Sequence, residues 1–110
     1  MDADQRIAEV SKVLGVDTRI KIIRLLGEKP LCVSALSRRL GITAGAVSQH
    51  LRLLKSARLV TPEKKGYFVH YSLDEQTLQS WKAEINKLLT VTEKLSCAVK
   101  ENKAAKNRKG

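Results

Sequence analysis

The most reactive side chains in the sequence are two cysteines, Cys32 and Cys97, which stand far apart in the chain. Neither belongs to a CxxC or CxC pair, and this usage suits a reducing compartment in which thiols stay free. A free thiol can bind a soft ion, can be oxidised, or can serve as a small apolar residue in a core. Cys32, in the stretch "PLCVS", is therefore either part of a sensor or a residue that fills a gap.

The other patterns that carry chemistry argue against catalysis. The sequence holds no Gly-rich phosphate loop, no cluster of metal ligands, and no nucleophile with a base at motif spacing. His50 has no second metal ligand at helical spacing. We therefore expect a protein that is not an enzyme and that requires no cofactor.

The charge of the chain predicts a polyanionic partner. Its 21 Lys and Arg residues exceed its 11 Asp and Glu residues, which gives a net charge of +10. Nucleic acid is the first candidate, an anionic membrane surface is the second, and charge that only solubilises is the third. No apolar run approaches the roughly 20 residues that cross a bilayer, and the first residues lack the order of a signal peptide. A cytoplasmic protein without a membrane partner is expected.

Helical spacing of apolar residues indicates two helices at the start of the chain. The first covers residues about 4–14. The second has Asp17 and Thr18 in its N-cap region and is ended by Gly27 and Pro30.

Two more helices follow at the spacing of a helix-turn-helix. A third helix is expected over Val33–Leu40, with a stop at Gly41. Thr43 is a good N-cap for the fourth helix, which should bury one apolar stripe. That stripe consists of Val47, Leu51 and Leu54. Two short helices joined by about three residues around a glycine form the outline of a helix-turn-helix.

From Leu59 onward the apolar period changes to two, which is typical of strands. Residues 67–73 are expected to form one strand and residues 60–62 its partner. Lys64, Lys65 and Gly66 then form the tip of a basic β-hairpin.

Asp74 is expected to cap a long final helix whose apolar residues alternate in spacing between three and four, as in a coiled-coil seam. Such a seam covers either a second copy of the chain or the chain's own core. We favour dimerisation, with the first helix alongside and part of the final helix on the core. The expected dimerisation residues are Ile7, Val10, Leu14, Leu78, Trp81, Ile85, Leu88 and Leu95. Residues 1–99 should form one DNA-binding and dimerisation domain, and residues 100–110 a basic disordered tail.

Several linked motifs resemble the ArsR/SmtB family of metal- and stress-responsive repressors. The run "AVSQHLRLLKSARLV" resembles the family's recognition-helix signature, A-V-S-x-H-L-x-x-L-x-x-A-G-L-V, except that Arg58 replaces the Gly that would cap the helix. The runs "TRIKIIRLL", "LCVSALSRRLGI" and "KKGYFVHYSL" resemble the family's second helix, third helix and wing. The resemblance implies a winged helix-turn-helix, mainly α with a small β-hairpin between the fourth and fifth helices. It also implies a repressor that dimerises through its terminal helices.

In helix-turn-helix proteins the second helix enters the major groove, and its first exposed residues reach base edges. Gln49 can pair with adenine, Thr43 is equally a plain N-cap, and His50 either packs beneath the helix or bonds to phosphate. Basic residues of the wing and the third helix either contact phosphate or form a solvated face. The predicted DNA-binding residues are Thr43, Ala44, Gly45, Ser48, Gln49, His50, Arg52, Lys64, Lys65, Tyr67, Arg38 and Arg39. The expected partner is double-stranded DNA with an inverted repeat, read by a homodimer at roughly 34 Å spacing.

The resemblance further implies an effector that releases DNA. The arsenic and cadmium type of the family carries "ELCVC", whereas this chain has "PLCVS", so Ser34 replaces one thiolate. Of the zinc ligands that the family carries on its last helix, only Asp74 is present.

Cys32 and Cys97 remain as effector residues. They can bridge as a disulfide or polysulfide, or bind a soft metalloid such as trivalent arsenic. The alternatives are a repressor without a ligand or with a non-thiol one, a nonspecific architectural DNA-binding protein, and an interaction module built on the long helix.

Overall fold

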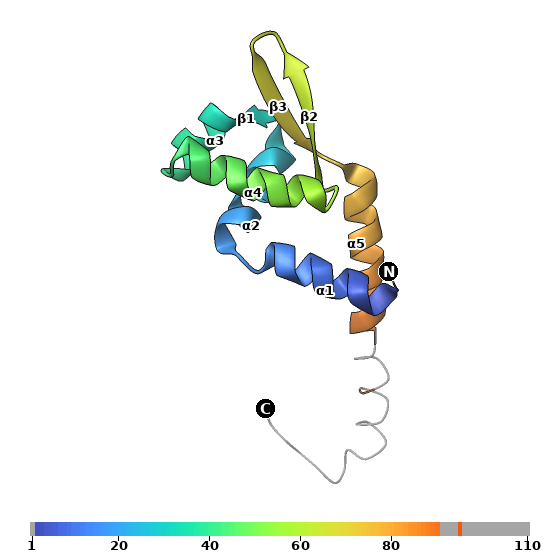
Figure 1. Cartoon of the computed structure of the whole chain (residues 1–110). Coiled ribbons are helices and arrows are strands. Elements are labelled where there is room, and N and C mark those ends of the chain that lie inside the picture. Colours follow the sequence, from blue (N-terminus) through green and yellow to red (C-terminus); the bar gives the residue numbers. More distant parts are fainter. Residues whose placement is uncertain (1, 91–94, 96–110) are drawn as a thin grey trace.

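The computed structural model describes residues 2–90 and residue 95 (Figure 1). Four helices precede a β-hairpin and a final helix, as predicted, and one additional short strand lies before the third helix. The elements are α1 (Ala3–Leu14), α2 (Asp17–Glu28), β1 (Leu31–Cys32), α3 (Val33–Leu40), α4 (Ala44–Ser56), β2 (Val60–Lys65), β3 (Phe68–Leu73) and α5 (Glu75–Leu89). Strands β2 and β3 project away from the helices (Figure 1).

A side-chain cap explains where α1 begins, but α2 begins without one. Asp2 Oδ1 accepts a hydrogen bond from Gln5 N at 2.8 Å, and Gln5 Oε1 accepts one from Asp2 N at 2.9 Å, which is a capping box. For α2 the predicted N-cap role of Asp17 and Thr18 was wrong. The residue before the helix is Val16, whose extended backbone starts α2 without any side-chain cap, and Asp17 is already helical.

The sequence predicts that Gly27 and Pro30 end α2, and the helix does end between these two residues. The helix continues through Gly27 to Glu28, and Lys29 has an extended backbone. Pro30 follows directly, and a proline disfavours helical backbone in the residue before it. Pro30 rather than Gly27 therefore sets the end of α2.

The junction between α3 and α4 follows the sequence prediction. Gly41 ends α3 in the left-handed region, with a φ of 68°, and its N–H donates to Ser37 O at 2.9 Å. Thr43 Oγ1 accepts a hydrogen bond from Ala46 N at 3.1 Å and caps α4. Residues 41–43 thus join the two helices with both ends capped.

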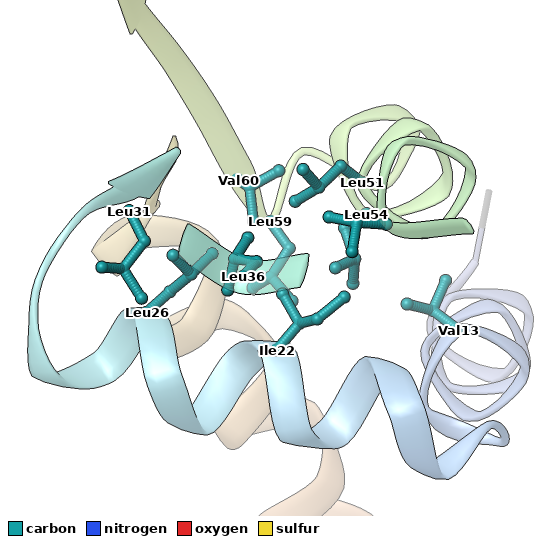
Figure 2. Close-up of a cluster of buried hydrophobic side chains, with 10 residues drawn as sticks. Val13, Ile22, Leu26, Leu31, Leu36, Leu51, Leu54, Leu59 and Val60 are labelled. Carbon is teal, nitrogen blue, oxygen red and sulfur yellow. The ribbon is translucent and has the colours of Figure 1, made fainter. Parts of the chain in front are cut away.

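The core lies between α2, α3, α4 and the start of β2, and it fixes the orientation of α4. Figure 2 shows its side chains pointing toward one another, with Val13 of α1 at one edge. The predicted stripe of α4 is buried, because Val47, Leu51 and Leu54 are at most 1% exposed. The buried cluster consists of Val13, Ile22, Leu26, Leu31, Leu36, Val47, Leu51, Leu54, Leu59 and Val60. The buried stripe of α4 therefore holds the helix against the core.

The hairpin turns later than the sequence predicted. Lys64 and Lys65 belong to β2, where they pair with Val69 and Phe68, and the turn consists of Gly66 and Tyr67. A two-residue hairpin turn needs a positive φ at its first position, and Gly66 supplies one of 65°. The prediction of a tip at Lys64–Gly66 was therefore wrong, and β3 begins at Phe68 rather than at Tyr67.

The third strand, β1, has no counterpart among the predicted elements. It adds to the sheet in the order β1-β3-β2, with Leu31 opposite Tyr71 and Cys32 opposite His70. Two residues are too short to show an alternating pattern, so only the folded chain reveals this strand.

Helix α5 begins as predicted and packs partly within the chain. Asp74 Oδ1 accepts a hydrogen bond from Thr77 N at 3.0 Å. Helix α1 lies against α5 (Figure 1). Arg6 of α1 and Glu84 of α5 form an ion pair of 3.2 Å. Leu78 and Trp81 pack on the core, whereas Leu88 and Leu95 are 51% and 59% exposed.

The remaining predicted dimerisation residues lie nearer the interior of the chain: Val10 is buried, and Ile7, Leu14 and Ile85 are half-buried. The first part of the seam therefore meets the chain itself. Cys97 and the tail 100–110 lie outside the described residues.

Candidate nucleic-acid interface

The start of α4 offers an exposed polar face opposite the buried stripe. Residues three or four apart share a face of a helix, so Gly45, Ser48, Gln49 and Arg52 line one side. The exposed residues of the predicted set on this helix and its cap are Thr43, Ala44, Gly45, Ser48, Gln49 and Arg52. This face presents hydroxyl, amide and guanidinium groups, which are the groups that hydrogen-bond to base edges and phosphates.

His50 is half-buried on the flank of α4 rather than on this exposed face. Its Nδ1 accepts a hydrogen bond from Arg19 Nε at 3.3 Å, and Arg19 Nη1 also donates to Val13 O at 3.1 Å. Arg19 thus joins α4 to the end of α1. Sequence reasoning missed this residue, since a contact between α2 and α4 leaves no trace in local spacing.

The predicted phosphate contacts are exposed but differ in their partners. Arg39 Nη2 lies 3.7 Å from Glu28 Oε1, which offsets part of its charge. Arg38 has no ion pair with any residue that the structure describes. Lys64 and Lys65 are exposed on β2, and Tyr67 at the turn is 100% exposed. Arg38 and the two lysines are therefore the basic groups best able to meet a phosphate.

The end of α4 keeps the geometry of a glycine cap although the residue is an arginine. Arg58 has a φ of 63°, and its N–H donates to Lys55 O at 2.8 Å while Leu59 N donates to Leu54 O at 2.9 Å. These two bonds form a Schellman motif, which normally places glycine at the left-handed position. The arginine therefore preserves the stop of α4 with backbone strain that a glycine would not have.

Cys32 lies where α3, β1 and the hairpin meet. It is the half-buried residue that precedes α3, and its side chain makes no capping hydrogen bond. In the sheet it stands opposite His70, which stands opposite Glu63 on the other side, so the three residues form one row on the same face. His70 Nδ1 is buried and lacks a hydrogen-bond partner in the described part of the chain.

The sequence analysis did not predict that Cys32 lies next to His70, because this contact depends on the pairing of β1 with β3.

Across residues 2–90 and 95, no three His, Cys, Asp or Glu side chains come close enough together to hold a metal ion. The same residues contain no helix long and apolar enough to span a membrane.

Helices α3 and α4 joined by a capped turn, followed by the β2–β3 wing, define a winged helix-turn-helix. The sequence model described as "Bacterial regulatory protein, arsR family" matches residues 17–61. An HTH-type transcriptional regulator of Mycobacterium tuberculosis is 37% identical over 72% of this chain and 74% of its own length. The chain therefore belongs to the ArsR family of bacterial regulatory proteins.

Two further relatives are informative. A homologue of a cadmium resistance transcriptional regulatory protein from Staphylococcus aureus is 39% identical over 64% of this chain, but the chain spans only 59% of that protein. A solved homodimeric winged helix-turn-helix DNA-binding domain from Mycobacterium bovis, a possible ArsR-family regulator, superposes with a TM-score of 0.63. That domain is 25% identical, and the match covers 82% of this chain and 80% of the domain.

Proposed function

We propose that the chain is a transcriptional repressor that binds DNA as a homodimer through α4 and the wing. The observation that carries this proposal is the exposed polar face of α4 opposite a fully buried stripe. A helix held rigidly from behind can present its side chains to the major groove in one orientation. Gln49 reads adenine there, and Ser48 and Arg52 contact bases or phosphates.

Basic groups on either side of α4 supply the affinity that does not depend on sequence. Arg38 on α3, and Lys64 and Lys65 on β2, are exposed, and the chain carries a net charge of +10. Each phosphate contact releases counterions, so binding should weaken steeply with salt. The DNA is a duplex with an inverted repeat, and the protein works in the cytoplasm.

The test is fluorescence anisotropy with a duplex recovered by in vitro selection and a scrambled duplex of the same length, across a salt titration. A repressor prefers the selected duplex by at least about 10³-fold. Equal affinity for both duplexes at every salt concentration would assign the chain to nonspecific architectural proteins instead.

We infer dimerisation from apolar residues at the end of α5 and at position 95 that are exposed in the described part of the chain. Leu88 and Leu95 are 51% and 59% exposed, and large apolar residues on an exposed helix need a covering surface. A second copy supplies it by two-fold symmetry. The solved Mycobacterium bovis relative is homodimeric, which supports a homodimer.

Sedimentation equilibrium of Leu88→Asp tests the dimer. The variant should be monomeric at concentrations where the wild type is dimeric. Phe68→Asp is the control, because Phe68 is 56% exposed but lies on the wing. A dimer that survives Leu88→Asp, or one lost equally in both variants, would place the interface elsewhere.

The finer proposal is that a thiol-reactive signal releases the DNA through Cys32 and Cys97. Cys32 pairs with β3 and precedes α3, so a group added to its thiol acts on the wing and on the helix that supports α4. The signal is a soft metalloid such as trivalent arsenic, or an oxidant or reactive sulfur species that joins the two thiols.

Anisotropy with reduced, oxidised, polysulfide-treated and arsenical-treated protein tests this finer proposal. Treatment should release wild-type protein from the selected duplex and leave Cys32→Ser and Cys97→Ser bound. If no treatment changes wild-type binding, the second candidate holds, a repressor without a thiol effector. The observation that favours this candidate is Ser34, which is exposed where the arsenic and cadmium type has its second thiolate.

A further inference from the structure

The side chain of Arg19 joins three helices at one point. Arg19 lies half-buried in the first turn of α2. Its Nη1 donates to Lys12 O at 3.3 Å and to Val13 O at 3.1 Å, both on α1, and its Nε donates to His50 Nδ1 of α4 at 3.3 Å. A guanidinium is planar and holds its donors in fixed directions, so these acceptors are held in a fixed arrangement. Arg19 therefore couples the position of α1 to that of α4.

The acceptors on α1 belong to its last turn. Carbonyl groups at the end of a helix lack partners within the helix, and the helix dipole favours a cation beside them. Arg19 supplies that cation. Val13, which is only 8% exposed, packs the same end of α1 against the core. The C-terminal end of α1 is therefore fixed beside α4.

The opposite end of α1 meets α5 beyond the point where α5 packs on the core. Leu78 and Trp81 pack on the core, whereas Arg6 of α1 pairs with Glu84, which lies further along α5. Leu88, one turn beyond Glu84, is 51% exposed. Figure 1 shows α1 running from α5 to the start of α2. Helix α1 thus links the outer part of α5 to the flank of α4.

The length of α1 makes its angle important for the dimer. With 12 residues, α1 is about 18 Å long. A tilt of about 10° around the end held by Arg19 would move the other end by about 3 Å. The rise of one base pair is about 3.4 Å. Because the dimer surface inferred above includes Leu88 of α5, such a tilt changes the separation of the α4 helices in the two copies by about one base pair.

We propose that Arg19 is a positioning residue that sets the distance between the two α4 helices of the homodimer, and thereby the spacing of the DNA half-sites. This inference rests on the proposed function, a homodimer on an inverted repeat. Arg19 is not among the predicted DNA contacts. It acts through the last turn of α1 and through His50.

The first measurement is the distance between the two α4 helices in the absence of DNA. Double electron–electron resonance measures it between spin labels on Lys55→Cys, an exposed position of α4 outside the predicted DNA contacts. The labelled full-length chain carries Cys32→Ser and Cys97→Ser, so that only position 55 reacts. This protein should give one narrow distance distribution. Arg19→Ala should broaden it or shift it by about 3 Å or more.

Three further variants separate this role from a general loss of stability. His50→Leu removes only the acceptor on α4 and should broaden the distribution as Arg19→Ala does. Arg19→Lys keeps a cation that can donate to the same acceptors, so it should restore most of the narrow distribution. Arg24→Ala removes an exposed arginine of α2 that has no ion pair within the described residues, and it should leave the distribution unchanged. Circular dichroism checks that each variant folds, and His50→Leu decides the question if Arg19→Ala does not fold.

The second measurement is anisotropy on duplexes whose half-sites are moved one base pair closer together or further apart. The wild type should bind the selected spacing at least about tenfold more tightly than either altered spacing, and Arg19→Ala should reduce this preference to about threefold or less. A residue that only stabilises the fold would weaken binding at all three spacings equally.

Two outcomes would overturn the proposal. One is a distance distribution in Arg19→Ala and His50→Leu that equals that of the wild type, and the other is an Arg19→Ala variant with the spacing preference of the wild type. A wild type that binds all spacings equally would instead contradict the proposed function, and the distance distribution would still decide whether Arg19 positions α4.

Discussion

Replacing Arg58 with glycine should stabilise the protein, although it removes a large side chain. A left-handed backbone costs a residue with a side chain about 1–2 kcal/mol. Glycine avoids that cost but has more freedom in the unfolded chain, which costs about 0.5–1 kcal/mol. The Arg58 side chain is exposed and unpaired within residues 2–90 and 95, so its loss removes little. The free energy of unfolding should therefore rise by about 0.5–1 kcal/mol, the difference between these two costs.

Urea unfolding followed by circular dichroism measures this change, and the midpoint of thermal unfolding should rise by about 2–8 °C in a domain of this size. Lys55→Gly provides the matched control, because Lys55 is exposed in α4 with ordinary helical backbone. There glycine should lower the free energy of unfolding by up to about 1 kcal/mol. If Arg58→Gly destabilises the protein as Lys55→Gly does, the strain assigned to Arg58 does not exist.

Three further predictions concern the core side of α4, its N-cap and the wing. Leu54→Ala should lower the free energy of unfolding by about 3 kcal/mol, as measured by urea unfolding, because Leu54 is fully buried. Leu53 is 43% exposed, and Leu53→Ala should change the same free energy by less than about 1 kcal/mol. Thr43→Ala should cost about 1 kcal/mol in the same assay through loss of the cap to Ala46 N, and Thr43→Ser should restore most of it; equal losses would contradict the cap. Lys64→Gln should weaken binding to the selected and the scrambled duplex alike and should reduce the slope of log affinity against log salt concentration by about one. An unchanged slope would show that Lys64 does not contact a phosphate.

The helix boundaries that the sequence predicts correctly are those set by local chemistry. Gly41, Thr43 and Asp74 act within a few residues of themselves, so their identities suffice to predict the caps that the structure contains. The buried stripe of α4 was predictable for a similar reason, since helical periodicity is a local property. Where a prediction failed, as for the N-cap of α2, the residue before the helix, Val16, starts it through its extended backbone and without a side-chain cap.

Contacts between distant segments could not be predicted in this way. The pairing of Cys32 with His70 requires β1 to join the sheet, and the hydrogen bond from Arg19 to His50 requires α2 to pass beside α4. Neither depends on a periodic pattern. The apolar seam of α5 could not be predicted in detail for the same reason. Trp81 packs on the chain's own core whereas Leu88 is exposed, and the spacing of the two residues does not distinguish them.

Sequence-specific reading of DNA by the exposed face of α4 is the central claim, and Gln49→Ala tests it most directly. By anisotropy, the variant should bind the selected duplex about tenfold more weakly, with an unchanged salt slope and unchanged affinity for the scrambled duplex. Gln79→Ala, an equally polar change at an exposed position of α5, should leave all three quantities as in the wild type. Equal binding of the selected duplex by wild type and Gln49→Ala, or equal losses on both duplexes, would contradict the account.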